Sequence, residues 1–221
     1  MKLYHGTNSE ALATILTSGL KPRGKGRGNW KHTVDSHPDM VYLTNAYALW
    51  FAYVASSESG GDMVVVEIDT ALLNPFRFVP DEDFLEQATR TQSGLGLAPT
   101  DKPMKYRNRW YCRHIREFSQ HWEDSLKHLG NCSYDGDIPT SAITRFAVIP
   151  GYRAPGLVMA GIDPSITLMN YKLLGEKYCN WTRWAFGDPL EPGGDHSVLP
   201  PDYMSKVSRD GIIVRSIKEL V

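Results

Sequence analysis

The residues Leu3-Tyr4-His5-Gly6-Thr7, close to the N-terminus, decide how the rest of the chain is interpreted. Leu3 and Tyr4 favour a short strand, which we expect to stop abruptly. His5 follows with an imidazole that can donate and accept hydrogen bonds. Gly6 has no side chain, so a ligand or another backbone segment can approach it closely. Taken alone, this stretch favours a structural histidine over a functional one.

Beyond this stretch the residues predict helices and strands in alternation. Asn8 and its neighbours are capping residues and Gly19 is a natural C-cap, so we expect a helix from about Ser9 to Ser18. Further helices are expected over about 46–56, 105–129 and 164–186, strands over 40–44, 63–69, 143–149 and 211–215, and a long loop over 89–103. Such alternation alone would equally suggest a parallel sheet.

The composition sets limits on the class of protein. The 221 residues suffice for one good core, or for one core with an appended lobe. The net charge of -1 excludes a chain that binds nucleic acid through its overall charge, so any such surface must be local. Cys112, Cys132 and Cys179 share no metal-type spacing, and their odd number fits a reducing compartment. No signal-peptide run or membrane-spanning stretch is present, and we expect a cytoplasmic protein with no membrane partner.

A glycine-spaced basic segment, Lys21–His32, precedes the second predicted strand. Its composition favours a solvated loop. The alternative is a mobile cover whose cations, Arg23 among them, meet phosphates. It contains no Walker lysine pattern, and no clean Gly-x-Gly-x-x-Gly follows a strand, so neither standard nucleotide motif applies.

Four acids follow Pro80: Asp81, Glu82, Asp83 and Glu86. Acids in a first helical turn complement the helix dipole, which is their structural interpretation. The functional interpretation is a carboxylate poised near a cationic centre. Clustered carboxylates also raise one another's pKa.

The predicted helix 105–129 begins with cations interleaved with aromatic residues. The favoured interpretation is an amphipathic helix whose aromatic side chains face the core and whose cations face water. The alternative is a patch for nucleic acid, with cations on phosphates and aromatic rings available to stack. The residues expected to bind a substrate in that case are Arg107, Arg109, Trp110 and Arg113.

The blocks Tyr4–Thr7 and Val41–Thr44, followed by the strand Val64–Asp69 and its acids, resemble the ADP-ribosyltransferase superfamily, in the class with a His-Tyr-Glu or His-Tyr-Asp triad. The first two blocks look especially like the small rifampin ADP-ribosyltransferases. The resemblance implies a mixed α/β (α+β) fold with a split, largely antiparallel sheet and flanking helices. It implies a catalytic domain over residues 1–150, with residues 151–221 as a C-terminal helical extension packed on it.

The resemblance also implies roles for individual residues. NAD would be a substrate, and no metal is implied. His5 would hydrogen-bond the adenosine ribose, Gly6 would present its backbone to the nicotinamide amide, and Tyr42 would stack on the nicotinamide ring. One carboxylate would stabilise the positive charge that develops on the nicotinamide ribose. The residues expected to contact NAD are His5, Gly6, Thr7, Tyr42, Leu43, Thr44 and Arg23.

The principal acid is predicted to be Glu82, with Asp81, Asp83 and Glu86 as rivals, because the spacing does not choose among them. We expect transfer of ADP-ribose to a macromolecular acceptor, with nucleic acid favoured over protein. Such an enzyme fits a bacterial toxin or a phage-defence effector with an antitoxin or inhibitor protein as partner. The alternatives are an RNA 2'-phosphotransferase of the same fold and a catalytically inactive module that binds nucleic acid or protein.

Overall fold

A computed structural model of the chain describes residues 1–24, 36–91, 101–162, 180–190 and 206–219. Within them, one seven-stranded sheet has the order β4-β5-β2-β1-β3-β6-β7, and every pairing is antiparallel. The expected α+β class with an antiparallel sheet is therefore confirmed, and a parallel sheet is excluded. The strands are β1 (Lys2–Asn8), β2 (Met40–Thr44), β3 (Met63–Asp69), β4 (Phe78–Pro80), β5 (Asn131–Asp135), β6 (Ile143–Ile149) and β7 (Ile213–Ser216).

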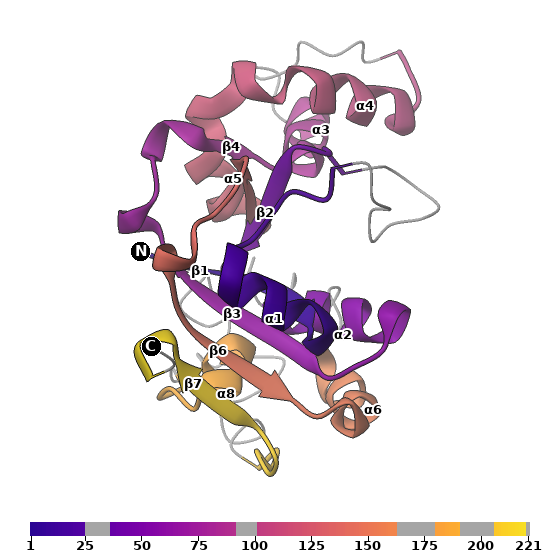
Figure 1. Cartoon of the computed structure of the whole chain (residues 1–221). Coiled ribbons are helices and arrows are strands. Elements are labelled where there is room, and N and C mark those ends of the chain that lie inside the picture. The colour runs from indigo at the N-terminus through magenta and orange to yellow at the C-terminus, as the bar shows by residue number, and fades with distance from the viewer. Residues whose placement is uncertain (25–35, 92–100, 163–179, 191–205, 220–221) are drawn as a thin grey trace.

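Helices flank the sheet (Figure 1). The α-helices are α1 (Ser9–Ser18), α2 (Ala48–Ser59), α3 (Glu82–Thr91), α4 (Met104–His114), α5 (Trp122–Leu129), α6 (Ala154–Leu157) and α8 (Asn180–Phe186). Shorter 3-10 or π turns are η1 (Thr70–Leu72), η2 (Pro75–Arg77), η3 (Ile115–His121), η4 (Thr140–Ala142), η5 (Gly151–Arg153), η6 (Val158–Ile162) and η8 (Ile217–Glu219). The prediction for α1 is confirmed: the Asn8 side chain accepts from the Ala11 amide at 3.2 Å, and Gly19 ends the helix with a φ of 77°.

The sheet is split between β1 and β2. All seven residues of β1 pair with β3, from Lys2 opposite Asp69 to Asn8 opposite Met63. Within the described strands, β1 and β2 pair only where Tyr4 lies opposite Thr44. Figure 1 shows the result, with β2, β4 and β5 in one half of the molecule and β1, β3, β6 and β7 in the other.

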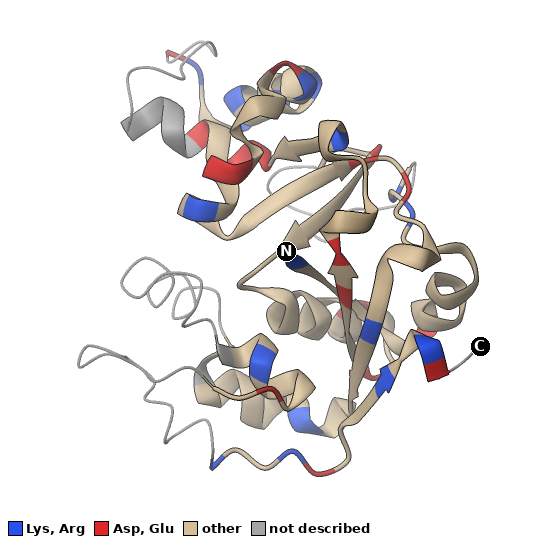
Figure 2. Ribbon diagram, turned by 90° about the vertical axis from the view of Figure 1, so that its left-hand side faces the viewer, with Lys and Arg blue, Asp and Glu red and all other residues tan. Residues whose placement is uncertain are grey.

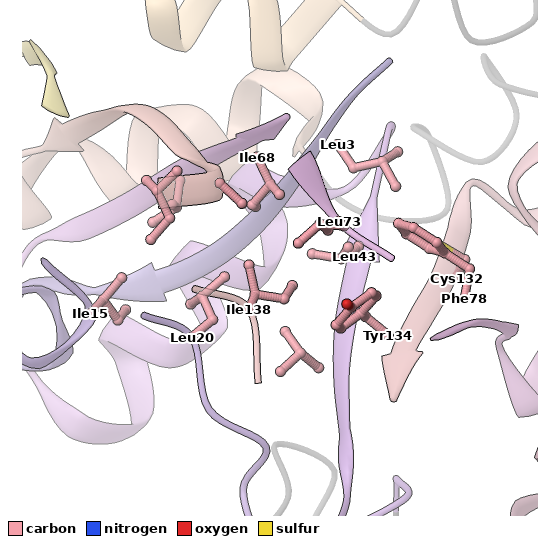
Figure 3. Packing of buried hydrophobic residues seen from close by; sticks show 14 of the residues in the cluster. Leu3, Ile15, Leu20, Leu43, Ile68, Leu73, Phe78, Cys132, Tyr134 and Ile138 are labelled. Atoms are coloured by element: carbon pink, nitrogen blue, oxygen red, sulfur yellow. The ribbon is translucent and has the colours of Figure 1, made fainter. Parts of the chain in front are cut away.

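The three larger of the four buried clusters among the described residues hold the layers together. One lies between the sheet and α1 and contains Leu3, Leu43 and Ile68 (Figure 3). A second joins the other face to α2, α6 and α8. The third, around Tyr111, joins β2 and β4 to α3, α4 and η3. Strand β2 contributes to both the first and the third cluster, because successive side chains of a strand point to opposite faces. Val41 and Leu43 belong to the first cluster, and Met40 and Tyr42 face the third.

The structure corrects several predicted boundaries. The first strand does not stop at His5 but continues to Asn8, because β3 pairs with it throughout. The predicted helix 105–129 is interrupted by η3, and α3 extends to Thr91, into the predicted loop. Pro80 belongs to β4, so the helix after it begins at Glu82. Of the predicted helix 164–186, only α8 lies within the described residues.

Candidate functional site

The side chains of Tyr42 and Glu82 come together because β2, β5 and β4 are neighbours in the sheet and α3 follows β4. Tyr42 on β2 and Val79 on β4 both lie opposite Ser133 of the intervening strand β5. Glu82 follows Val79 by three residues, as the first residue of α3. The Tyr42 hydroxyl consequently lies 2.8 Å from Oε1 and 2.7 Å from Oε2 of Glu82. Figure 2 shows the acidic residues at the start of α3 in red.

The direction of this hydrogen bond follows from a third group. The backbone N–H of His37 donates to the Tyr42 hydroxyl oxygen at 2.7 Å. A phenol has one proton to donate, and its oxygen is already accepting. An ionised carboxylate can only accept, so the Tyr42 hydroxyl donates a hydrogen bond to Glu82 while keeping its proton, and it stabilises the ionised form of that carboxylate.

Burial sets the charge state of the pair. It raises the pKa of Glu82 to about 7, and the hydrogen bonds from Tyr42 and from the Cys112 thiol oppose that rise. Burial also raises the pKa of Tyr42 well above its ordinary value, so its hydroxyl stays protonated. The buried Asp81 has a strongly raised pKa, first from burial and then from Glu82 and Asp83. Burial also raises the pKa of Asp83, so three neighbouring carboxyl groups are perturbed, which is a common feature of functional sites.

The rival acids are engaged elsewhere. The Asp81 carboxylate accepts from the Asp83 backbone amide at 2.8 Å, as a cap of α3. The Asp83 carboxylate accepts from the Asn108 side chain at 2.8 Å. Glu86 forms a buried ion pair with Arg107, whose Nε lies 3.1 Å from Glu86 Oε1. All four acids thus gather at the start of α3, and Glu82 is the one bonded to Tyr42.

His5 spans the split in the sheet. Its Nδ1 lies 2.9 Å from the Tyr42 carbonyl oxygen. A carbonyl can only accept, so Nδ1 carries the proton and the neutral ring presents the lone pair of Nε2. Burial lowers the pKa of His5, which favours this neutral form. His5 can therefore accept a hydrogen bond from a hydroxyl group.

Packing accounts for Gly6. A Cβ at this position would lie 2.2 Å from the Ala48 carbonyl oxygen and 2.5 Å from the Ala52 backbone nitrogen. Helix α2 can lie on β1 only because the side chain is missing. Beyond Tyr4, the described strand β2 no longer pairs with this part of β1. The backbone N–H and C=O groups of β1 near Gly6 are therefore not paired with the described strand β2.

The other residues expected to contact NAD have structural contacts. Leu43 is in the core, and Thr7 is buried. The Thr44 hydroxyl donates to the Gly130 carbonyl at 2.7 Å and accepts from the backbone before α2. Arg23 binds the hydroxyl and carbonyl oxygens of Ser36, the residue before His37. Arg23 therefore lies beside the segment that supports Tyr42.

The four substrate residues expected on α4 fall into two groups. Arg107 is bound to Glu86, and Trp110 is half-buried and stacks on His114 with ring centroids 4.2 Å apart. Arg109 and Arg113 lie exposed on the outer face of α4.

Sequence reasoning missed Asn108 and Cys112 on the inner face of α4, and His37 beside Tyr42. Asn108 donates to Asp83 at 2.8 Å, and the Cys112 thiol donates to Asn108 at 3.7 Å and lowers the pKa of Glu82. Their spacing of four residues would have placed the two side chains on one helix face. No sequence signal marks His37, because its contribution is a backbone N–H.

Two further findings concern the described residues. No group of three or more His, Cys, Asp or Glu side chains among them is arranged to hold a metal ion. Their helices include none with the length and apolar character needed to cross a membrane.

Comparisons with known proteins do not assign a family. No protein-family model and no curated protein matches the chain. Nine chains of solved structures match, and one of them is named EcPltA. It is 17% identical to this chain, the match covers 66% of this chain and 74% of that chain, and the TM-score is 0.33. A likeness at this level supports no conclusion about fold or activity.

Proposed function

We propose that the chain is an NAD-dependent ADP-ribosyltransferase that uses Glu82, Tyr42 and His5. The observation that carries the proposal is the hydrogen bond from Tyr42 to a buried carboxylate whose pKa is about 7. His5 is tied to the same tyrosine through its backbone carbonyl. The acid, the phenol and the imidazole thus form one connected group, although they come from three separate segments of the sequence.

The proposed reaction breaks the bond between the nicotinamide nitrogen and the ribose C1'. The bonding electron pair leaves with nicotinamide, and positive charge develops on the ribose. Ionised Glu82 stabilises that charge from a fixed position, which costs no reorganisation during the reaction. An acceptor nucleophile then forms the new bond to C1' and releases its proton to a base.

The neighbouring residues fix the geometry. Tyr42 holds the carboxylate through its hydroxyl, and its partly buried ring packs against the third cluster. In this proposal the face of the ring left uncovered stacks on the nicotinamide. His5, with Nε2 as an acceptor, suits a ribose hydroxyl. The acceptor in this proposal is a macromolecule, with nucleic acid favoured over protein.

The test uses NAD carrying a label in its adenosine part, incubated with separate pools of RNA, DNA and protein. The wild type should label one pool, and Glu82→Gln should abolish labelling. Glu123→Gln, which changes an exposed acid on α5, is the matched control and should label normally. If no pool is labelled and no nicotinamide is released, the proposal fails, and a binding module of the same fold becomes the better explanation.

A further inference from the structure

The outer face of α4 carries a row of cations that the candidate site does not use. Lys105, Arg109 and Arg113 follow one another at intervals of four residues, so they share one face. Neighbours in the row are separated by about 6 Å along the helix axis. All three are exposed, and no ion pair joins any of them to another described residue.

The lack of ion pairs distinguishes this row from the two arginines next to it. Nearby arginines have acidic partners: Arg107 binds Glu86, and Arg116 binds Asp135 at 2.7 Å. The sequence of α4 itself contains no Asp or Glu. The chain as a whole has a net charge of -1, so the row is a local concentration of positive charge.

An aromatic side chain accompanies the row. Tyr106 is 49% exposed, so its ring is accessible to a ligand. It follows Lys105 directly and lies one helical turn before Arg109, so it borders the row. Cations that bind phosphates beside a ring that can stack on a base are the two components of single-strand recognition.

The neighbouring face of α4 reaches the candidate site. Asn108 donates to Asp83 at 2.8 Å, and the Cys112 thiol, which donates to Asn108 at 3.7 Å, lies close enough to Glu82 to affect the pKa of that carboxyl. Arg109 and Arg113 follow these two residues directly in the sequence. Because a helix with its side chains is about 10–12 Å across, the row lies within about one helix diameter of the two residues that reach the acids.

We propose that single-stranded nucleic acid docks on Lys105, Arg109 and Arg113 and presents the acceptor group to Glu82. The acceptor role rests on the proposed function, whereas the docking itself does not. A single strand fits better than a duplex, because its bases are free to stack on Tyr106. DNA and RNA offer the same phosphates and rings, so the test includes both.

The test measures fluorescence anisotropy of a labelled oligo(dT) and a labelled oligo(U) over a range of salt concentrations. The protein carries Glu82→Gln, so that binding is read without turnover. The substitutions Lys105→Gln, Arg109→Gln and Arg113→Gln together should lower the affinity. They should also reduce the slope of log K against log salt by about 2, since each single-strand phosphate contact contributes about 0.7. Tyr106→Ala should weaken binding about tenfold at constant slope.

A matched control removes three exposed cations in the half of the sheet that carries β7. Lys206→Gln, Arg215→Gln and Lys218→Gln should together leave the affinity and the slope nearly unchanged. Equal losses in both triple variants, a wild-type slope near zero, or label transfer to protein alone would each overturn the proposal. Nicotinamide release is measured separately, so a failed docking surface can be distinguished from a failed proposed function.

Discussion

Replacing Tyr42 by phenylalanine removes the hydroxyl that donates to Glu82 and leaves the ring in place. The carboxylate then loses its 2.7 Å hydrogen bond, which favours its ionised form. A hydrogen bond to a charged group contributes about 1.5–3 kcal/mol. At 1.36 kcal/mol per pKa unit, the pKa of Glu82 should rise by about 1–2 units from its value of about 7.

The assay is nicotinamide release from NAD, with kcat/KM measured from acid to alkaline pH. Because the ionised carboxylate is the active form, the rate should rise with pH through the pKa of Glu82. In Tyr42→Phe this rise should be displaced by about 1–2 units to higher pH. Tyr152→Phe, which changes a tyrosine that is 73% exposed, should leave the profile unchanged.

The same shift can be read without activity, from an NMR titration of the Glu82 carboxyl carbon. A profile or titration that stays in place in Tyr42→Phe would refute the inferred direction of the hydrogen bond. A displacement to lower pH would refute it as well, because the phenol would then be stabilising the protonated acid.

Three further predictions concern stability. Glu82→Gln should raise the free energy of unfolding at pH 8 by up to about 3 kcal/mol, because the folded-state pKa of about 7 lies above the ordinary 4.5. This stabilisation should disappear below pH 4.5, where the acid is protonated in both states, and urea unfolding at the two pH values checks it. Gly6→Ala should lower the melting temperature severely or prevent folding, since its Cβ would overlap the Ala48 carbonyl. Gly156→Ala, with open space around it, should be close to neutral in the same thermal scan. Arg145→Met should lower the free energy of unfolding by about 3 kcal/mol, measured by urea unfolding, because it leaves the buried Glu67 without its 2.6 Å ion pair. Adding Glu67→Gln should restore part of that free energy. If the double variant is no more stable than Arg145→Met, the ion-pair account is contradicted.

The sequence predicted the elements that local signals define. Helix α1 has an Asn8 cap and a terminal Gly19, and β3 is a β-branched run between turn residues. Strand β5 was missed because its residues Asn131, Cys132 and Ser133 have no strong strand preference. It forms because β2 and β4 pair with it on its two sides, a tertiary effect that no local pattern contains.

The candidate site was predicted in part. Sequence resemblance selected His5 and Tyr42, and the structure brings Glu82 into contact with Tyr42. The spacing could not separate Glu82 from its three neighbours, because the choice depends on how β4 presents the first turn of α3 beside β2. The support from His37 and Cys112 arises from chain segments that approach only after folding.

The central claim is that Glu82, held by Tyr42, stabilises the charge that develops as NAD loses nicotinamide. The most direct test is the rate of nicotinamide release by the wild type, Glu82→Gln and Asp83→Asn. Asp83 is the matched neighbour, because it is adjacent in sequence but binds Asn108 instead of Tyr42. We predict that release is lost in Glu82→Gln and largely retained in Asp83→Asn. Release that survives in Glu82→Gln, or that is absent from the wild type, would contradict the account.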